Sequence, residues 1–274
     1  MGKIEKNVIL NNGVSIPTLG FGTYKIDDNE LAYRCVSDAL QVGYRHVDTA
    51  YFYENERGVG RAINDSGIDR KDIFLTTKIW TTDCGYDNTL FAVDRALKLL
   101  NLDYIDLMLI HWPTEKNRET WRALERLVEE KALRAIGLSN FKEHHIKDLL
   151  VTANIVPQIN QVELNPLFQQ PELREYCYKH GIRVEAWAPL LRGKTFTLMS
   201  IETLAKKYNK TPAQIVLRWN LENGIITIPK TTHKERMIEN IDVYDFELTA
   251  EDKLLIEKEN LNIRQYRDPD NHGF

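Results

Sequence analysis

The stretch "IFLTTKIWTTDCGYDNTLFAVDRALKLLNLDYIDLMLIHW", residues 73–112, contains one complete strand–helix–strand unit. Residues 73–80 and 105–112 are short apolar runs of the length and composition typical of buried strands. Between them, apolar residues recur at three- and four-residue spacing, which predicts a helix with one apolar face. These residues are Leu90, Val93, Leu97 and Leu100. Strands that alternate with helices form parallel sheets, so the stretch predicts an α/β fold.

The same alternation runs through most of the chain. Eight β-rich runs are each followed by a helical run, and Gly or polar residues separate the units. The runs are residues 19–24, 46–50, 73–80, 105–112, 134–140, 157–164, 183–189 and 225–230. Eight such units in 274 residues predict a closed (β/α)8 TIM barrel, with residues 1–274 forming a single domain.

Three segments lie outside this count. Residues 8–17, with Asn12-Gly13 at the turn, predict an N-terminal β-hairpin that plugs the N-terminal end of the barrel. Residues 200–224 predict two helices before the last strand, and residues 248–261 predict an extra C-terminal helix. The alternative fold, an open doubly wound sheet, would need a Gly-rich fingerprint at its first strand–helix turn. Here Gly20 and Gly22 have no third glycine after them.

Composition excludes several classes of function. The net charge is −4 and the charged residues are interleaved, so there is no basic stripe for nucleic acid. No apolar run is long enough for a signal peptide or a membrane span. Cys35, Cys84 and Cys177 are far apart and form no CxxC, which predicts a reducing compartment and no structural zinc. We therefore expect a cytoplasmic protein, and a monomer because no coiled coil or exposed apolar repeat is present.

Four reactive side chains lie where strands two, three and four end. Asp48 ends the second strand and Tyr53 follows it, Lys78 ends the third, and His111 ends the fourth. Taken singly, such residues are more often helix caps, solvated charges or packing. In a barrel, however, chemistry sits at the carboxyl ends of the strands, so all four would meet at one mouth.

Together these side chains predict a general acid beside a carbonyl group. A tyrosine hydroxyl has a pKa of about 10, and we expect the ammonium of Lys78 to lower it. Asp48 would hold Lys78 in place, and His111 would donate a hydrogen bond to the carbonyl oxygen. No nucleophile elbow and no HExxH spacing is present, which disfavours covalent or metal chemistry.

A proton donor that faces a carbonyl needs a hydride donor as its partner. Trp187 could stack on a nicotinamide ring, and Ser139, Asn140 and Gln161 could bind its carboxamide. Lys230 and Arg236 supply positive charge near a helix N-terminus, which suits a phosphate group. The additional phosphate of NADPH distinguishes it from NADH, so we expect NADPH/NADP+ as the cofactor.

The motifs resemble those of the aldo-keto reductases over essentially the whole chain. They read GFGTY, YRHVDTAYFYENERGVG, LTTKIW, DLMLIHWP, RAIGLSNF, NQVELNP, VEAWAPL and ITIPKTTHKERMIEN. The chain looks like the compact branch, which includes 2,5-diketogluconate reductases, glyoxal reductases and protozoal prostaglandin F synthases. The resemblance implies NADPH-dependent reduction of a small-molecule aldehyde or ketone to an alcohol, without a metal.

The resemblance also implies a role for each matching residue. The catalytic tetrad would be Asp48, Tyr53, Lys78 and His111, with Tyr53 as the acid. The cofactor contacts would be Gly22, Thr23, Tyr24, Ser139, Asn140, Gln161, Trp187, Pro189, Leu190, Lys230, Thr231, Arg236, Glu239 and Asn240. The substrate contacts would be Tyr24, Phe52, Trp80, His111 and Trp112.

The chain departs from the family pattern in three places. Residues 188–193, Ala-Pro-Leu-Leu-Arg-Gly, replace the usual Ser-Pro-Leu-Gly, so the loop over the pyrophosphate could grip the cofactor differently. His233 stands where a small hydroxyl residue is frequent, and would either add a pH-dependent contact or tolerate NADH better. The loop after the fourth strand and the C-terminal tail are both short, which predicts a more open and less selective pocket.

Two other classes of function stay open at this point. A glycoside hydrolase on the same barrel would need two carboxylates across the pocket, and Glu163 and Glu185 on neighbouring strands are candidates. An NADPH-binding sensor without turnover would have no need of Tyr53. Consumption of NADPH in the presence of an aldehyde distinguishes all three.

Overall fold

A ring of eight parallel strands forms the centre of the computed structural model, which describes residues 5–274. The strands are β3 (Phe21–Gly22), β4 (His46–Asp48), β5 (Phe74–Ile79), β6 (Ile105–Ile110), β7 (Leu133–Ser139), β8 (Ile159–Glu163), β9 (Arg183–Trp187) and β10 (Ile226–Thr227). They pair in chain order, and the ring closes where Leu19 bridges Thr227 in parallel. The N–H of Gly22 also donates to the carbonyl of Pro229 at 3.1 Å. The predicted (β/α)8 barrel is confirmed, and the open sheet is excluded.

Gly20 and Gly22 allow the first and last strands to approach each other closely. A Cβ on Gly20 would lie 2.9 Å from Cγ2 of Ile228, and a Cβ on Gly22 would lie 2.9 Å from the carbonyl oxygen of Ile228. Any larger residue would therefore push the closing strands apart. The two glycines of the first strand serve the closure of the barrel.

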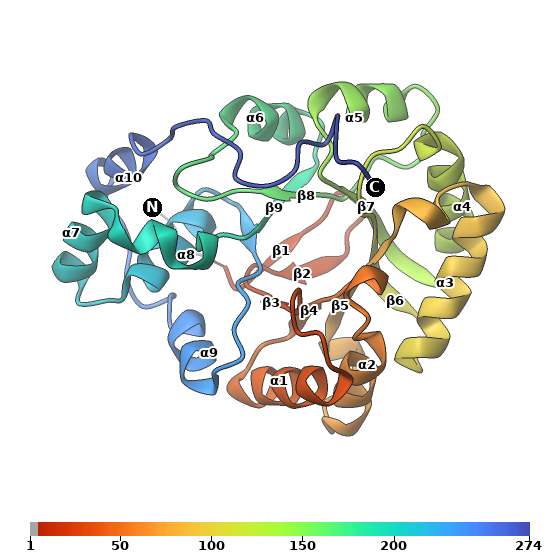
Figure 1. Cartoon of the computed structure of the whole chain (residues 1–274), viewed down its shortest axis with the longest axis horizontal. Coiled ribbons are helices and arrows are strands. Elements are labelled where there is room, and N and C mark those ends of the chain that lie inside the picture. Colours follow the sequence, from red (N-terminus) through yellow and green to blue (C-terminus); the bar gives the residue numbers. More distant parts are fainter. Residues whose placement is uncertain (1–4) are drawn as a thin grey trace.

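Helices surround the strands (Figure 1). They are α1 (Asn29–Val42), α2 (Glu56–Asp65), α3 (Tyr86–Leu100), α4 (Asn117–Glu129), α5 (Glu143–Leu150), α6 (Pro171–Lys179), α7 (Met199–Tyr208), α8 (Pro212–Glu222), α9 (Lys234–Ile241) and α10 (Ala250–Glu257). Short 3-10 turns are η1 (Tyr51–Tyr53), η2 (Arg70–Asp72), η3 (Thr81–Asp83) and η4 (Leu191–Thr197). The two helices before the last strand and the extra C-terminal helix are confirmed. Within residues 5–274, no helix is both long and apolar enough to cross a membrane.

Local sequence signals set the ends of several helices. The carboxylate of Asp28 accepts a hydrogen bond from the N–H of Leu31 at 2.7 Å, which caps the start of α1. Gly43, with φ of +119°, ends the same helix in a conformation that favours glycine. Thr211 and Thr249 form capping boxes at the starts of α8 and α10.

The N-terminal hairpin closes one end of the barrel. It consists of β1 (Asn7–Ile9) and β2 (Ser15–Pro17), which pair antiparallel. Leu10 and Ile16 are buried in an apolar cluster with side chains of the barrel strands, including Phe74 and Ile159, the first residues of β5 and β8. The side chain of Asn11 donates to the carbonyl of Pro157 at 3.0 Å. The predicted plug is confirmed, and it leaves the C-terminal end of the barrel for a ligand.

Candidate active site

A cavity of about 1180 Å³ opens at the carboxyl ends of the strands. It is larger than the roughly 300–1,000 Å³ typical of a pocket for one small ligand. Nearly all of the predicted site residues line it. They are Gly22, Tyr24, Asp48, Phe52, Tyr53, Trp80, His111, Trp112, Ser139, Asn140, Gln161, Trp187, Pro189, Leu190, Lys230, Thr231, Arg236, Glu239 and Asn240. Two predicted residues, Thr23 and Lys78, lie behind its wall.

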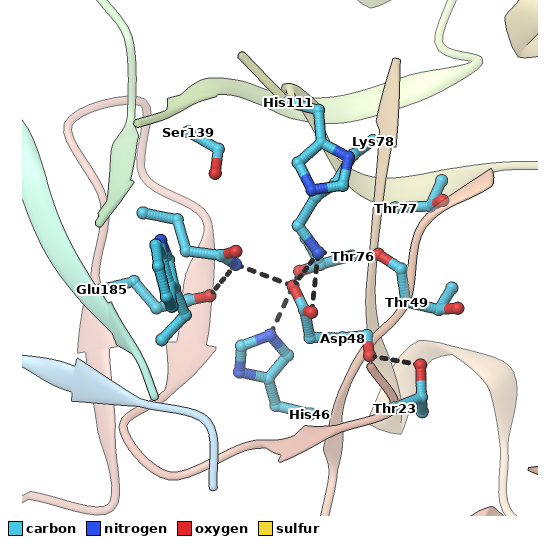
Figure 2. A network of polar contacts seen from close by, with 12 residues as sticks. Thr23, His46, Asp48, Thr49, Thr76, Thr77, Lys78, His111, Ser139 and Glu185 are labelled. Atoms are coloured by element: carbon cyan, nitrogen blue, oxygen red, sulfur yellow. Dashed lines mark hydrogen bonds and ion pairs between the residues drawn. The ribbon is translucent and has the colours of Figure 1, made fainter. Parts of the chain in front are cut away.

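Lys78 is buried at the end of β5 and forms an ion pair with Asp48 at the end of β4 (Figure 2). Its ammonium donates to both carboxylate oxygens, at 2.7 and 2.8 Å, and to the carbonyl of Thr49 at 2.8 Å. These three bonds use all three ammonium protons. Lys78 is therefore held rigidly beneath the cavity floor.

Tyr53 and His111 meet above this ion pair. The turn η1 follows β4 directly and brings the ring of Tyr53 to 5.0 Å from Nζ of Lys78. The His111 ring, which follows β6, lies edge-on to Tyr53 with centroids 5.7 Å apart. The four side chains of the predicted tetrad thus come together from three neighbouring strands.

The charge of Asp48 changes the expected effect of Lys78 on Tyr53. Burial raises the pKa of Tyr53 well above its usual value, and the negative charge of Asp48 raises it further. Both oxygens of Asp48 bind the ammonium, and the charge of Lys78 offsets only part of these two effects. The pKa of Tyr53 is thus raised, in the direction opposite to the expected net effect. The phenol stays protonated at neutral pH, which is the state that a proton donor needs.

His111 is neutral at physiological pH. Burial lowers its pKa well below the usual value, and the positive charge of Lys78 lowers it further. Its Nδ1 has no hydrogen-bond partner among the described residues, which fits an unprotonated nitrogen there and a proton on Nε2. Such an imidazole can donate one hydrogen bond to an oxygen in the cavity.

Gln161 links Asp48 to a second buried carboxyl group. Its amide nitrogen donates to Oδ2 of Asp48 at 2.7 Å and to Oε1 of Glu185 at 2.6 Å. Both amide protons are used, so only the carbonyl oxygen of Gln161 remains for a ligand. Burial raises the pKa of Glu185, and the nearby charge of Asp48 raises it further. No local pattern in the sequence indicates this chain of contacts, which depends on Gln161 and Glu185 being in register on β8 and β9.

Asn140 connects three other site residues. Its amide nitrogen donates to the carbonyl of His111 at 2.9 Å and to Oγ of Ser139 at 3.1 Å. Its side-chain oxygen accepts from Nε1 of Trp187 at 2.9 Å. The residue has φ of +65°, which Asn tolerates better than most residues. Asn140 therefore fixes the orientation of its neighbours.

Two residues differ from their expected placement. The hydroxyl of Thr23 is buried and donates to the carbonyl of Asp48 at 2.9 Å, so it supports β4 from behind and does not reach the cavity. His233 is exposed at the N-cap of α9 and does not line the cavity. Both expectations for His233, a pH-dependent contact with the cofactor phosphate or a better tolerance of NADH, stay predictions.

Aromatic side chains form the wall next to His111. Phe52 stacks on Trp80 with centroids 3.9 Å apart and planes 13° apart. Phe274 packs against Trp80 at 4.8 Å and against Trp112 at 5.4 Å. No sequence motif indicated that Phe274 belongs to this wall. Although the C-terminal tail is short, it reaches this wall.

The glycoside hydrolase alternative lacks its carboxylate pair. Glu163 and Glu185 are both fully buried and do not line the cavity. The carboxylate of Glu163 accepts from the N–H groups of Gln265, at 2.9 Å, and Tyr266, at 3.3 Å. Each of the two glutamates thus has a hydrogen-bonding role inside the protein.

The opposite side of the cavity fits the phosphate end of a dinucleotide. Lys230 follows β10 and Arg236 lies in the first turn of α9, and β10 lies across the ring from β5 and β6. One cavity therefore joins a cationic end to an aromatic end beside Tyr53. Its volume and charge distribution fit NADPH together with a small substrate.

Sequence comparison identifies the family. The Aldo/keto reductase family matches residues 18–260. The chain belongs to the aldo/keto reductase family. It is 49% identical over 268 residues to a 9,11-endoperoxide prostaglandin H2 reductase of Trypanosoma cruzi, covering 96% of this chain and 95% of the relative. It is 46% identical over 268 residues to the glyoxal reductase of Bacillus subtilis, covering 97% of each.

A solved structure supports this assignment. A mutant of Gox0644 in complex with NADPH superimposes with a TM-score of 0.94 at 38% identity, covering all of both chains. The expected reaction class and cofactor, NADPH-dependent reduction of aldehydes and ketones, are confirmed by this family membership. The chain is an NADP-dependent oxidoreductase, and neither alternative class finds support.

Proposed function

We propose that Tyr53 is the general acid of this aldo/keto reductase and that His111 binds the substrate carbonyl oxygen. The observation that carries the proposal is the position of both side chains directly above the buried Lys78–Asp48 ion pair, beside an aromatic wall. The remaining residues predicted to contact the cofactor or the substrate keep those roles, and all of them except Thr23 line the cavity. Lys78 and Asp48 act through Tyr53.

Each side chain has one task in the reduction. NADPH, when bound, supplies the hydride that attacks the carbonyl carbon. His111 donates a hydrogen bond to the carbonyl oxygen and orients it, and Tyr53 transfers its phenolic proton to that oxygen as negative charge develops. The phenolate that remains is stabilised by the ammonium of Lys78, 5.0 Å from the ring, until solvent returns a proton. The product is the alcohol.

The substrates are small aldehydes and dicarbonyl compounds. The wall built by Phe52, Trp80, Trp112 and Phe274 offers flat apolar surface close to Tyr53. Such a surface suits short-chain and aromatic aldehydes. The 46% identity to a glyoxal reductase supports the dicarbonyl class. Bulky, rigid ketones such as steroids would have to displace Phe274.

The protein acts as a monomer in the cytoplasm, and its 274 residues form one domain. All three cysteines are free and buried, which fits a reducing compartment.

Tyr53→Phe tests the assignment of the acid. Loss of the hydroxyl should lower kcat for methylglyoxal by about 10²–10⁴-fold, because general acid catalysis contributes on this scale. NADPH affinity, measured by fluorescence titration, should stay unchanged. Tyr51→Phe is the matched control, because Tyr51 lies in the same turn and stacks on Arg95 outside the cavity. Near wild-type kcat in Tyr53→Phe would make His111 the proton donor.

A further inference from the structure

The C-terminal tail, residues 264–274, runs from the side of α10 across the strand ends in Figure 1, and its last residue packs against Trp80 and Trp112, which follow β5 and β6. Its first part is held by the buried Glu163 through the N–H groups of Gln265 and Tyr266. Its last residue, Phe274, completes the aromatic wall of the cavity. Between these two points the tail contacts α5.

Three side chains at the start of α5 contact this middle part of the tail: Lys142, His144 and His145. We call these three side chains the tail clamp. The ammonium of Lys142 bonds both tail carboxylates, at 2.6 Å to Asp268 and 2.7 Å to Asp270. Nε2 of His144 and of His145 lie 2.9 and 3.1 Å from the other oxygen of Asp270. Asp270 therefore has partners on both of its oxygens.

Two histidines and an aspartate at these distances also resemble a metal site. The hydrogen bonds argue against that interpretation. Nδ1 of His145 accepts from the N–H of Lys142 at 3.2 Å, which places the ring proton on Nε2, the atom that faces Asp270. A metal would need that nitrogen unprotonated, and it would lie next to the ammonium of Lys142. The geometry is that of a hydrogen-bonded contact between protein groups.

The clamp is mechanically close to the cavity wall. Only three residues separate Asp270 from Phe274, and three further contacts hold this segment. Nε2 of His272 lies 2.9 Å from the carbonyl oxygen of Pro113, next to Trp112. The guanidinium of Arg267 lies 4.4 Å from the Phe274 ring centroid and donates to the carbonyl of His272 at 2.5 Å. A shift of Asp270 would therefore move Phe274.

We infer that the tail clamp positions Phe274 as a wall of the substrate pocket, so that Lys142, outside the cavity, controls how tightly aromatic substrates bind. This inference rests on the proposed function, because it takes the cavity beside Phe274 as the carbonyl pocket. Lys142 is a positioning residue that acts through Asp268, Asp270 and Phe274.

The charges around the clamp favour the contact between the clamp and the tail at neutral pH. The hydrogen bond from Lys142 lowers the pKa of Asp268, and Arg264 adds a positive charge on the tail itself. Burial lowers the pKa of His145 to about 4, so it contributes as a neutral donor. The ion pairs remain partly exposed, so added salt should weaken them.

Lys142→Met tests the inference, with Lys147→Met as the matched control. Lys147 lies on the same helix, and its ion pair with Glu143 does not involve the tail. In Lys142→Met, the amides of residues 266–274 should exchange with deuterium roughly fivefold faster or more, measured without substrate. The KM for benzaldehyde should rise roughly threefold to tenfold, since exposed ion pairs contribute modestly, while kcat and NADPH affinity stay within about twofold. The control should change none of these.

The reverse side of the contact gives a second test. Asp268→Asn with Asp270→Asn should reproduce the rise in KM, and adding Lys142→Met to that variant should add little. In the wild type, the KM for benzaldehyde should rise with added salt, and in Lys142→Met it should respond less.

The outcomes separate this inference from the proposed function. Unchanged exchange of the tail in Lys142→Met would show that no clamp exists. Faster exchange with an unchanged KM would show that the clamp does not position the pocket wall. If the wild type reduced no carbonyl compound, the proposed function would fail, while the exchange experiment would still report on the clamp.

Discussion

The two ends of the barrel are built from the same strands but differ in chemistry. Along β5, the side chains that face the barrel interior alternate with those that face the helices, and the inward series is Phe74, Thr76 and Lys78. Phe74 packs in the apolar cluster under the hairpin, whereas Lys78 forms an ion pair with Asp48 at the other end. Four residues along one strand thus separate an apolar layer from an ionic one.

The difference teaches where stability and function reside. Burying Leu10 and Ile16 against the strand ends removes apolar surface from water, which stabilises the fold. Burying Asp48 and Lys78 costs desolvation energy that their attraction only partly offsets. The hairpin end should therefore carry stability without chemistry, and the cavity end chemistry without a gain in stability.

The largest expected effect comes from removing the positive charge of Lys78 at the cavity end. Lys78→Met should lower kcat by about 10²–10⁴-fold, because the phenolate of Tyr53 loses its supporting charge. It should also destabilise the fold by about 3–5 kcal/mol, because Asp48 stays buried without its partner. Adding Asp48→Asn should restore most of the stability in urea unfolding but none of the activity. A double variant as unstable as the single one would contradict the comparison.

A matched change at the hairpin end should have the opposite profile. Ile16→Ala leaves a cavity in a fully buried cluster and should lower the free energy of unfolding by about 2–5 kcal/mol. The kcat of the folded fraction should not change. Ile9→Ala, at a position 58% exposed on the same hairpin, should stay within about 0.5 kcal/mol of the wild type. A fall in kcat for Ile16→Ala would show that the two ends are coupled.

Within the cavity end, Arg236→Ala should separate cofactor binding from chemistry. We expect NADPH binding to weaken by about 1.5–3 kcal/mol, since a hydrogen bond to a charged group is lost, while NADH binding changes little. Titration of both cofactors measures this directly. His233→Ala should leave both affinities unchanged, because His233 does not line the cavity. Equal losses of NADPH and NADH affinity in Arg236→Ala would place the 2′-phosphate elsewhere.

The smallest effect concerns Glu56, a buried carboxyl group on α2 that does not line the active-site cavity. Thr77 donates to one of its oxygens at 2.6 Å, and burial raises its pKa to about 7. The carboxyl group of Glu56 binds its proton more tightly in the folded protein than in the unfolded chain. The free energy of unfolding therefore falls as the pH rises from the pKa of this group in the unfolded chain toward 7. Between pH 6 and 7 the loss should be about 1 kcal/mol.

Glu56→Gln should reduce the pH dependence seen in urea unfolding curves by this amount, while the contribution of Glu185 remains, and it should leave kcat unchanged. Glu129→Gln serves as the control, because Glu129 is the exposed last residue of α4. If stability between pH 6 and 7 is as steep in Glu56→Gln as in the wild type, another group is responsible. A change in kcat would tie Glu56 to the chemistry.

Much of the fold was predictable because its signals are local. The three- and four-residue spacing in α3 and the short apolar runs of β5 and β6 depend only on neighbouring residues. The convergence of Asp48, Tyr53, Lys78 and His111 followed from one rule, that parallel strands end on the same side of a barrel. The hairpin plug followed from the Asn12-Gly13 turn and the apolar residues on both sides of it.

The sequence by itself determined the barrel, the set of reactive side chains and the family. Only the tertiary structure decided that Thr23 supports β4 from behind, that Glu163 holds the tail 102 residues further along the chain, and that Phe274 completes the pocket wall. It also reversed the expected direction of the Tyr53 pKa. The physical reason is common to all of these: burial and charge depend on which groups meet across the closed ring, and no local pattern in the chain encodes those distances.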